Sequence, residues 1–229
     1  AAADALRPTL ILQPDDPSRP YQLGLYLAAL QPTEALVYLE LAAREGTLAR
    51  PAAALQRAIR TAALQDEPAY TYLQAGRQLA SLGEWVLAGE AFRQAVLARP
   101  DYAEAWALLG ETRQQAGGDV RQAQADLEHA LELKPDSALV NSLLSLFWER
   151  QGDHQKMADC LASAAHAEPG NPAWQADWGR ALGLLGDLDA AQAHYEAAVS
   201  LAPQDALYLR LLAEFSMRYE VDVATLGLP

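Results

Sequence analysis

The sequence predicts an all-α protein built as an array of helix-turn-helix units. Proline recurs at a near-constant interval, at Pro100, Pro135, Pro169 and Pro203, which are 35, 34 and 34 residues apart. A glycine followed by an acidic residue recurs midway between these prolines. Proline cannot continue a helix, and glycine accepts the left-handed conformation that ends one. Each interval is therefore predicted to hold two helices, joined by a glycine turn and followed by a proline.

Large and small side chains keep step with the prolines. Because they are three or four residues apart within each helix, they share one helical face and predict the buried side of each unit. The rows are Gly76, Gly110, Ser145 and Gly179 in the first helices, then Ala88, Ala123, Met157 and Ala191, then Phe92, Leu127, Leu161 and Tyr195, then Ala95, Ala130, Ala164 and Ala198 in the second helices.

Taken in chain order, the pattern divides the sequence into a short extended part and a series of helices. Residues 1–19 are rich in proline and predict an extended segment, whose Leu10, Ile11 and Leu12 suggest a strap across the array; a linker or a partner-binding arm is the alternative. Residues 20–68 predict a helical part, with a leftover second helix at 20–31 and a degenerate repeat at 35–68. The four full repeats are predicted at 69–102, 103–137, 138–171 and 172–205.

The last part, 206–229, predicts a closing helix at about 206–219 and a tail. Its helix, ALYLRLLAEFSMRY, is more apolar than the polar outer face expected of a capping helix. Either the tail covers this helix or another chain does, so a homodimer through the C-terminal helix is a possibility to test.

The stretch QQAGGDVRQAQ, residues 114–124, is predicted to be a turn. Its Gly118-Asp119 aligns with Gly83-Glu84, Gly152-Asp153 and Gly186-Asp187, and no lysine follows as a phosphate loop would require. The 35-residue interval leaves one extra residue in this turn, which the alignment assigns to Gly117.

One unit resembles a known repeat closely. AEAWALLGETRQQAGG followed by AQADLEHALELKP resembles the tetratricopeptide repeat, a helix-turn-helix unit of 34 residues, through Trp106, Leu109, Gly110, Ala123, Leu127, Ala130 and Pro135. The resemblance implies a right-handed superhelical array, an α-α solenoid, in which the first helices line a concave face that binds a partner. It also places groove positions at i, i+3 and i+7 of each first helix.

The groove positions that this resemblance implies have mixed chemistry. Arginine can hold a carboxylate with two hydrogen bonds, and leucine or tyrosine can anchor apolar side chains, so a peptide segment is the expected guest. The alternative is that these residues are ordinary solvated helix faces with some Arg-Glu pairing. The candidate partner-binding residues are Tyr70, Leu73, Arg77, Glu104, Glu111, Leu146, Arg180, Arg210 and Glu214, with Ala107, Leu139, Ser142, Ala173, Ala176 and Leu207 at the intervening positions.

Composition argues against several other classes of protein. The formal net charge of -13 repels phosphates, which disfavours nucleic acid and anionic membranes as partners. A single cysteine, Cys160, excludes an intrachain disulfide. His154, Cys160 and His166 are six residues apart, and because six residues rotate a helix by about 600° they point in different directions, so no metal site is predicted. No catalytic motif and no cofactor motif is present, so no enzyme and no cofactor is expected.

The leading functional hypothesis is a non-enzymatic scaffold or adaptor that binds a peptide segment or partner protein in its groove. The alternative is the repeat portion of a larger enzyme, receptor or membrane-anchored assembly factor, and a self-assembling structural subunit comes third. No run of about 18 apolar residues is present to insert directly into a membrane. The sequence leaves localisation open: it slightly favours the cytoplasm, with an extracytoplasmic location after removal of an N-terminal signal or anchor as the other possibility.

Overall fold

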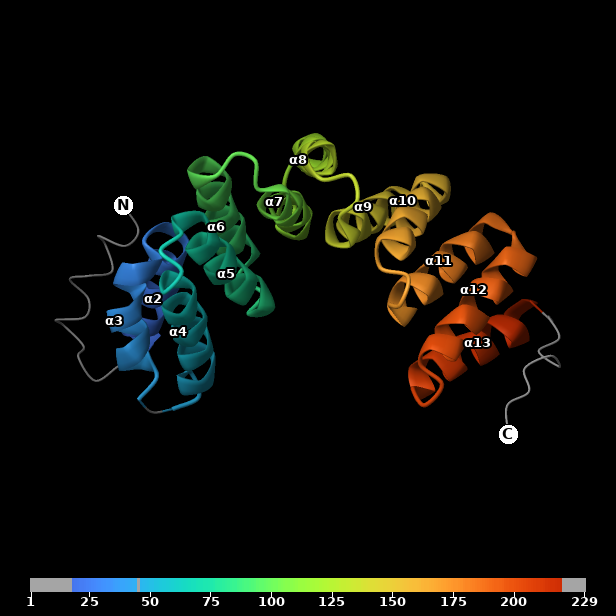
Figure 1. The fold of residues 1–229 in the computed structure, drawn as a ribbon. Helices are drawn as coiled ribbons and strands as arrows, with labels where there is room; N and C mark the ends of the chain where they lie inside the picture. The colour runs from blue at the N-terminus through green and yellow to red at the C-terminus, as the bar shows by residue number, and fades with distance from the viewer. Residues whose placement is uncertain (1–17, 45, 220–229) are drawn as a thin grey trace. The chain divides into compact units, whose positions relative to one another are not determined.

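The computed structural model describes residues 18–44 and 46–219, and within them the chain forms twelve α-helices and no β-strand (Figure 1). The all-α helical-repeat class predicted from the sequence is thus confirmed. Of the extended segment predicted at 1–19, residues 1–17 lie outside the described residues, as does the tail at 220–229, while Ser18 and Arg19 begin the first described helix. The helices are α2 (Ser18–Leu30), α3 (Pro32–Ala42), α4 (Ala49–Ala63), α5 (Pro68–Ser81), α6 (Trp85–Ala98), α7 (Ala103–Gln115), α8 (Val120–Leu133), α9 (Ala138–Gln151), α10 (His154–Ala167), α11 (Pro172–Leu185), α12 (Leu188–Leu201) and α13 (Ala206–Tyr219).

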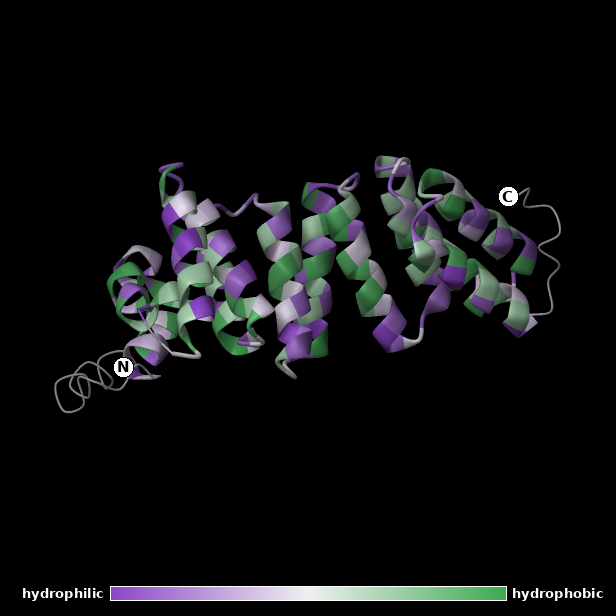
Figure 2. Ribbon diagram, turned by 90° about the horizontal axis from the view of Figure 1, so that it is seen from below, coloured by the Kyte–Doolittle hydropathy of each residue, from purple (hydrophilic) through white to green (hydrophobic). Residues whose placement is uncertain are grey.

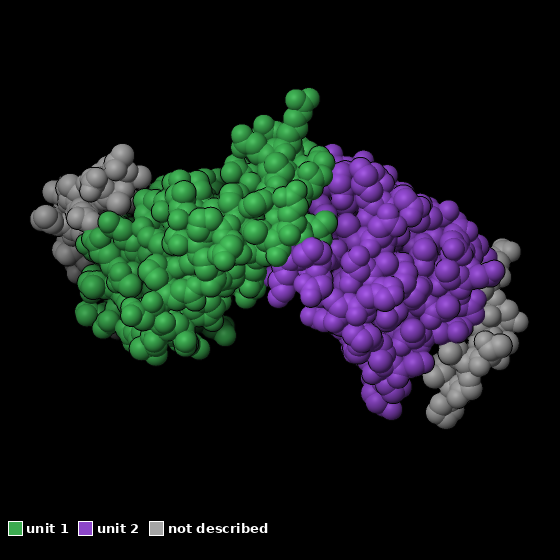
Figure 3. Space-filling model, turned by 45° about the horizontal axis from the view of Figure 1, so that its top comes forward, with its two compact units in different colours: residues 1–133 green, residues 134–229 purple. Residues whose placement is uncertain are grey.

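The chain divides into two compact units, residues 1–133 and 134–229, which Figure 3 colours separately. The first unit contains helices α2–α8 and the second contains α9–α13. Inside each unit, helices that follow one another in sequence pack against one another. Hydrophobic and hydrophilic stretches are interspersed along the helices seen in Figure 2, as expected where a helix buries one side against its neighbours. None of the described helices is long and apolar enough to cross a membrane.

Glycine turns join the two helices of each pair α5/α6, α7/α8, α9/α10 and α11/α12. The first helix of each pair ends at a glycine in the left-handed region, at Gly83, Gly117, Gly152 and Gly186, with φ of 78°, 70°, 75° and 83°. The amide of the next residue donates a hydrogen bond to a carbonyl five residues back, as in Asp153 to Trp148 at 3.0 Å. This is the Schellman arrangement, which satisfies carbonyls that the helix end would leave free.

The α7/α8 turn has one residue more than the others, and the structure corrects which residue it is. Gly117, predicted to be the extra residue, occupies the left-handed position that Gly83, Gly152 and Gly186 occupy in their turns. The amide of Gly118 makes the Schellman hydrogen bond to the Arg113 carbonyl, at 2.8 Å. Aligning Gly118-Asp119 with the glycine-acid pairs of the other turns did not identify the extra residue. The extra residue is Gly118, which lies between the left-handed glycine and the helix cap.

The predicted small residues lie where the two helices of a pair approach most closely. A Cβ added at Gly76 would come within 2.6 Å of the Phe92 ring, and one at Gly110 within 2.7 Å of Leu127 Cγ. At Gly179 the nearest atom would be the Ala191 carbonyl oxygen, at 2.9 Å. Glycine therefore permits these close approaches, because any side chain would need the facing helix to move.

The N-terminal helices pack differently from the later pairs. Helix α2 contacts α3, α5 and α6, and α4 contacts both α3 and α5, so α2, α3, α4 and α5 form a closed ring of neighbours. A close approach at Gly24, where an added Cβ would lie 2.7 Å from Leu39 Cδ2, brings α2 against α3. Residues from α2 and α6, such as Leu23 and Phe92, share one hydrophobic core and are fully buried. The N-terminal helices of unit 1 therefore form a small bundle, besides packing against one another in sequence order.

Candidate functional site

The structure separates the predicted groove positions into buried and accessible rows. Leu73, proposed from the sequence as a partner-binding residue, is only 1% exposed and belongs to the core of unit 1. Ala107, Ser142 and Ala176, at the same i+3 position in later first helices, are also buried. They are buried because the neighbouring helices cover this side of each first helix, so they cannot contact a partner in the folded chain.

Arg210 holds the same i+3 position on α13, and there the environment differs. Its side chain is 67% exposed, because no described helix follows α13 to cover it. Arg210 Nε lies 3.5 Å from Glu214 Oε1, one helical turn further along. Both groups are well solvated, so this ion pair contributes little to stability.

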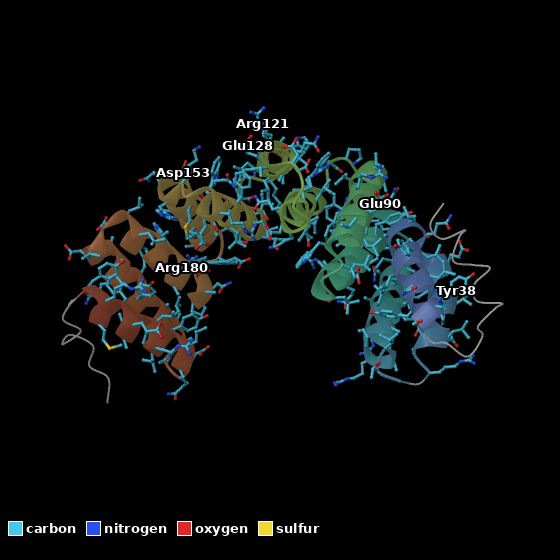
Figure 4. The ribbon with its side chains drawn as sticks, turned by 180° about the vertical axis from the view of Figure 1, so that it is seen from behind. Tyr38, Glu90, Arg121, Glu128, Asp153 and Arg180 are labelled. Carbon is cyan, nitrogen blue, oxygen red and sulfur yellow. The ribbon has the colours of Figure 1, made fainter. Side chains whose placement is uncertain are left out.

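Two of the candidate arginines are engaged with carboxylates of the chain itself. Arg77 on α5 forms an ion pair with Glu104 on α7, and Arg180 on α11 (Figure 4) forms one with Glu149 on α9. Arg180 Nη2 also lies 3.3 Å from the second Glu149 oxygen. Each pair joins the first helices of consecutive repeats, which is the Arg-Glu pairing raised as the alternative from sequence.

Burial changes the pKa of Asp177, the acidic residue beside the pair of Arg180 and Glu149. Asp177 Oδ1 lies 3.8 Å from Arg180 Nε. Burial raises the pKa of the Asp177 carboxyl, and the Arg180 guanidinium opposes that rise by favouring the charged form. Arg180 therefore lies close to two carboxylates of its own unit, those of Glu149 and Asp177, and they largely compensate its positive charge.

The other predicted positions are accessible, and their role stays a prediction. Leu146 on α9 is 38% exposed. Glu111 on α7 is partly exposed and accepts a hydrogen bond from Gln115 Nε2 at 2.8 Å. Tyr70 on α5 is half-buried and lines a surface groove.

A pocket of about 210 Å³ opens between α11, α12 and α13, and we call it the α13 pocket. It brings together two predicted residues, Arg180 and Glu214, with residues that sequence reasoning missed. Its lining residues are Arg180, Gly183, Leu184, Tyr195, Leu211, Glu214, Phe215, Arg218 and Tyr219. The walls are held by aromatic packing, since the Phe215 ring lies 5.1 Å from the rings of both Tyr195 and Tyr219.

A second groove, of about 360 Å³, runs between α4 and α5, and we call it the α4/α5 groove. Of the predicted residues only Tyr70 lines it. Small and polar side chains form the rest of the surface, and none of them is acidic. The lining residues are Ala54, Arg57, Ala58, Thr61, Ala62, Tyr70, Gln74 and Gln78.

Sequence reasoning missed most of these lining residues because it named only positions i, i+3 and i+7 of each first helix. On α13 the pocket uses Leu211, Glu214 and Arg218, which are i+4, i+7 and i+11 from Leu207. On α5 the groove uses Tyr70, Gln74 and Gln78, again in steps of four. A period of 3.6 residues per turn permits either i+3 or i+4, and the large apolar Leu73 was the available signal that i+3 faces the core.

The surroundings of His194 and Cys160 fit a structural role for both side chains. The imidazole of His194 stacks on Trp178 with ring centroids 3.8 Å apart, and its Nδ1 lies 2.8 Å from Gln175 Oε1. Burial raises the pKa of the Cys160 thiol to about 11, so the thiolate needed for nucleophilic chemistry is scarce near neutrality. Within 18–44 and 46–219, no group of three or more His, Cys, Asp or Glu side chains is placed to hold a metal ion.

Comparison with known proteins identifies the repeats. A profile of the tetratricopeptide repeat matches residues 103–137 and 179–205. No curated protein sequence matches the chain.

Solved structures share the fold at low sequence identity. A thermophilic tetratricopeptide repeat protein of Thermus thermophilus is similar with a TM-score of 0.58 and 22% identity, over 90% of this chain and 100% of that one. YrrB, described as a tetratricopeptide repeat protein with an unusual peptide-binding site, is similar with a TM-score of 0.53 and 16% identity, over 91% and 97%. MamA from Desulfovibrio magneticus RS-1 is similar with a TM-score of 0.53 and 20% identity, over 82% and 98%.

These matches agree with the helix pairs, the glycine turns and the rows of small residues described above. The shared fold is a scaffold for protein interactions, and proteins built from it are typically non-enzymatic. The chain therefore carries tetratricopeptide repeats at residues 103–137 and 179–205 and shares the fold of solved tetratricopeptide repeat proteins.

Proposed function

We propose that this chain is an adaptor that binds an extended segment of a partner protein at the α13 pocket. The observation that carries the proposal is the lining of that pocket, which combines accessible apolar side chains with an arginine that no described carboxylate pairs. Such a lining suits a segment with one large apolar side chain and a nearby carboxylate.

The apolar part of the pocket supports an anchoring role. Leu184 is 44% exposed although it lies beside the nearly buried Phe215 and Tyr195. An apolar side chain entering the pocket would remove this surface from water, which favours binding by about 25 cal/mol per Å² of apolar surface buried. The aromatic walls are already packed, so little ordering cost is added on binding.

The charged part of the pocket supports a preference for acidic partners. Arg180 is engaged by Glu149, and Glu214 by Arg210. Arg218 lines the pocket and has no carboxylate within ion-pair distance among the described residues. Its guanidinium can therefore donate two parallel hydrogen bonds to a partner carboxylate.

Selection from a displayed library of random peptides on the full chain tests the proposal. The affinity of recovered peptides is then measured by fluorescence anisotropy for the wild type, Leu184→Glu and Leu201→Glu. Leu184 and Leu201 are both 44% exposed, but only Leu184 lines the pocket. We expect Leu184→Glu to weaken binding about tenfold or more, as for an interface anchor, and Leu201→Glu to leave it nearly unchanged.

Two results would overturn the proposal. One is equal loss of binding in both variants, or recovery of no peptide above background. The other is occupation of the pocket by a second copy of the chain, which light scattering would reveal as a dimer that Leu184→Glu dissociates and Leu201→Glu does not.

A further inference from the structure

The α4 region has a charge opposite to that of the chain as a whole. The chain has 30 acidic against 17 basic residues, yet residues 46–65 contain three arginines and no acidic residue. All three, Arg50, Arg57 and Arg60, lie on α4. A basic helix on an acidic protein creates a local positive field that attracts anionic groups.

The sides of α4 have distinct neighbours. Ala52, Leu55, Ile59 and Ala62 are buried in the core of unit 1. Toward α3, Gln56 Nε2 donates to the Leu36 carbonyl at 3.4 Å and Arg60 lies 3.7 Å from Glu40. Toward α5, Arg57 lines the α4/α5 groove together with Ala54, Ala58 and Thr61. Arg57 and Arg60 are therefore on one helix but face different surfaces.

The polar groups of the groove are available for a ligand. Arg57 is exposed and has no carboxylate within ion-pair distance in the part of the chain that the structure describes. The side-chain amides of Gln74 and Gln78 are half-buried and make no hydrogen bond to any described residue. An amide side chain offers both a donor and an acceptor, which is what a peptide group needs.

We propose that the α4/α5 groove binds an acidic segment of a partner protein in extended conformation. The small Ala54 and Ala58 let a backbone approach α4 closely, Gln74 and Gln78 hydrogen-bond to its peptide groups, and Arg57 pairs with an Asp or Glu side chain. The site belongs to unit 1 and to helices other than those of the α13 pocket, so it is independent of the function proposed above.

The lining residues of the groove favour an extended acidic segment over a helical partner and over a nucleic acid. A helical partner needs apolar pockets for its i, i+3, i+4 and i+7 anchors, but Tyr70 is the only large side chain with apolar surface among the lining residues of the groove. A nucleic acid would also pair with Arg57, but the remaining acidic surface of the chain repels a polyanion. A short acidic segment meets the local positive field while leaving the rest of the surface untouched.

The test uses the full chain and a displayed library of random peptides, with three variants. Arg57→Glu and Arg60→Glu change the net charge by the same two units on the same helix, so their difference isolates the groove. Gln74→Ala removes one amide of the groove. Peptides recovered on the wild type are sequenced, and acidic ones are labelled for anisotropy together with a fluorescein-labelled single-stranded DNA.

We expect the recovered pool to be enriched in Asp and Glu. Acidic peptides should bind about tenfold or more weakly to Arg57→Glu, severalfold more weakly to Gln74→Ala, and nearly as well to Arg60→Glu as to the wild type. The Leu184→Glu variant should not affect these peptides, and peptides lost with Leu184→Glu alone belong to the α13 pocket.

Three outcomes overturn the proposal. They are a recovered pool without acidic enrichment, equal weakening by Arg57→Glu and Arg60→Glu, or DNA binding as tight as that of the peptides. The first two leave the proposal for the α13 pocket untouched, because that site is read out by Leu184→Glu.

Discussion

At the scale of single residues, Gly110 shows how a missing side chain sets the distance between two helices. A Cβ at this position would lie 2.7 Å from Leu127 Cγ and 2.8 Å from the Ala123 carbonyl oxygen. The second contact is with backbone, which cannot move aside as the end of a flexible side chain would. The close approach of α7 to α8 therefore depends on the absence of a side chain at residue 110.

We predict that Gly110→Leu destabilises the chain by about 1–3 kcal/mol, the usual cost of overpacking a tight contact. The matched control is Gly170→Leu, because an added Cβ at Gly170 meets nothing within 4 Å and its φ is not positive. Thermal or urea unfolding measures both. Equal unfolding midpoints for the two variants would show that α7 and α8 tolerate a wider separation.

His194 connects the packing of unit 2 to pH. Its ring lies against Trp178 of α11, faces Gln175 on the same helix, and is near His166 of α10, whose ring centroid lies 5.8 Å from that of Trp178. Burial lowers the pKa of His194 below its ordinary value of 6.5, and the charge of His166 lowers it further. The folded chain thus favours neutral His194 more than the unfolded chain does.

This shift predicts the direction of a pH dependence. Because the folded pKa of His194 is lowered, its contribution to stability is complete above about pH 6.5 and is lost as the pH falls through the folded pKa. His194→Gln should therefore reduce the loss of stability between pH 7 and about pH 5. The measurement is the unfolding midpoint across that range, with His129→Gln on α8 as control. An unchanged pH slope in His194→Gln would contradict the assignment.

At the scale of elements, the turns show how one aspartate can end one helix and begin the next. In the α9/α10 and α11/α12 turns, the aspartate amide closes the Schellman motif, while its carboxylate caps the following helix. In the α7/α8 turn these roles are divided: Gly118 closes the motif, and Asp119 Oδ1 accepts the Arg121 amide at 2.8 Å. The extra glycine separates two tasks that a single residue performs elsewhere.

Deleting one of the two glycines should therefore change stability by less than about 1 kcal/mol, because Asp119 can take both roles and no hydrogen bond is lost. The deletion also reduces the interval from Gly110 to Ala123 to that between Gly179 and Ala191, so the α8 face stays in register. Gly152→Ala is the comparison, since alanine at φ 75° costs about 1–2 kcal/mol. Urea unfolding of both variants decides, and a deletion that costs more than Gly152→Ala would mean that α8 needs the longer turn.

The elements also show which parts of the fold local patterns can predict. Periodic proline, glycine and alanine predicted the helix pairs of the later repeats because each residue acts within its own turn or helix. The ring formed by α2, α3, α4 and α5 could not be predicted in this way. It depends on contacts of α2 with α5 and α6, about 40 to 70 residues further along the chain, and on the tight fit of Gly24 against Leu39.

At the scale of the whole molecule, the candidate sites were less predictable than the fold. Spacing identified Arg77 and Arg180 as accessible cations, and they are at least partly accessible. Their pairing with Glu104 and Glu149 joins helices of different repeats, which no local pattern encodes. The same holds for the α13 pocket, whose lining comes from three helices, and for the α4/α5 groove, where only Tyr70 was anticipated.

One helical position is buried in the first helices of the repeats but exposed on α13. Its residues are Leu73, Ala107, Ser142 and Ala176, and then Arg210. This position determines how the array could be lengthened by engineering. A helix grafted after Tyr219 would cover Arg210 and Met217, which correspond in register to the buried Ala176 and Gly183 one repeat earlier. Covering Arg210 would take its charge and that of the neighbouring Glu214 out of water, which costs several kcal/mol unless further hydrogen bonds compensate. A functional extension of this chain would therefore begin with small residues at positions 210 and 217, before any new repeat is added.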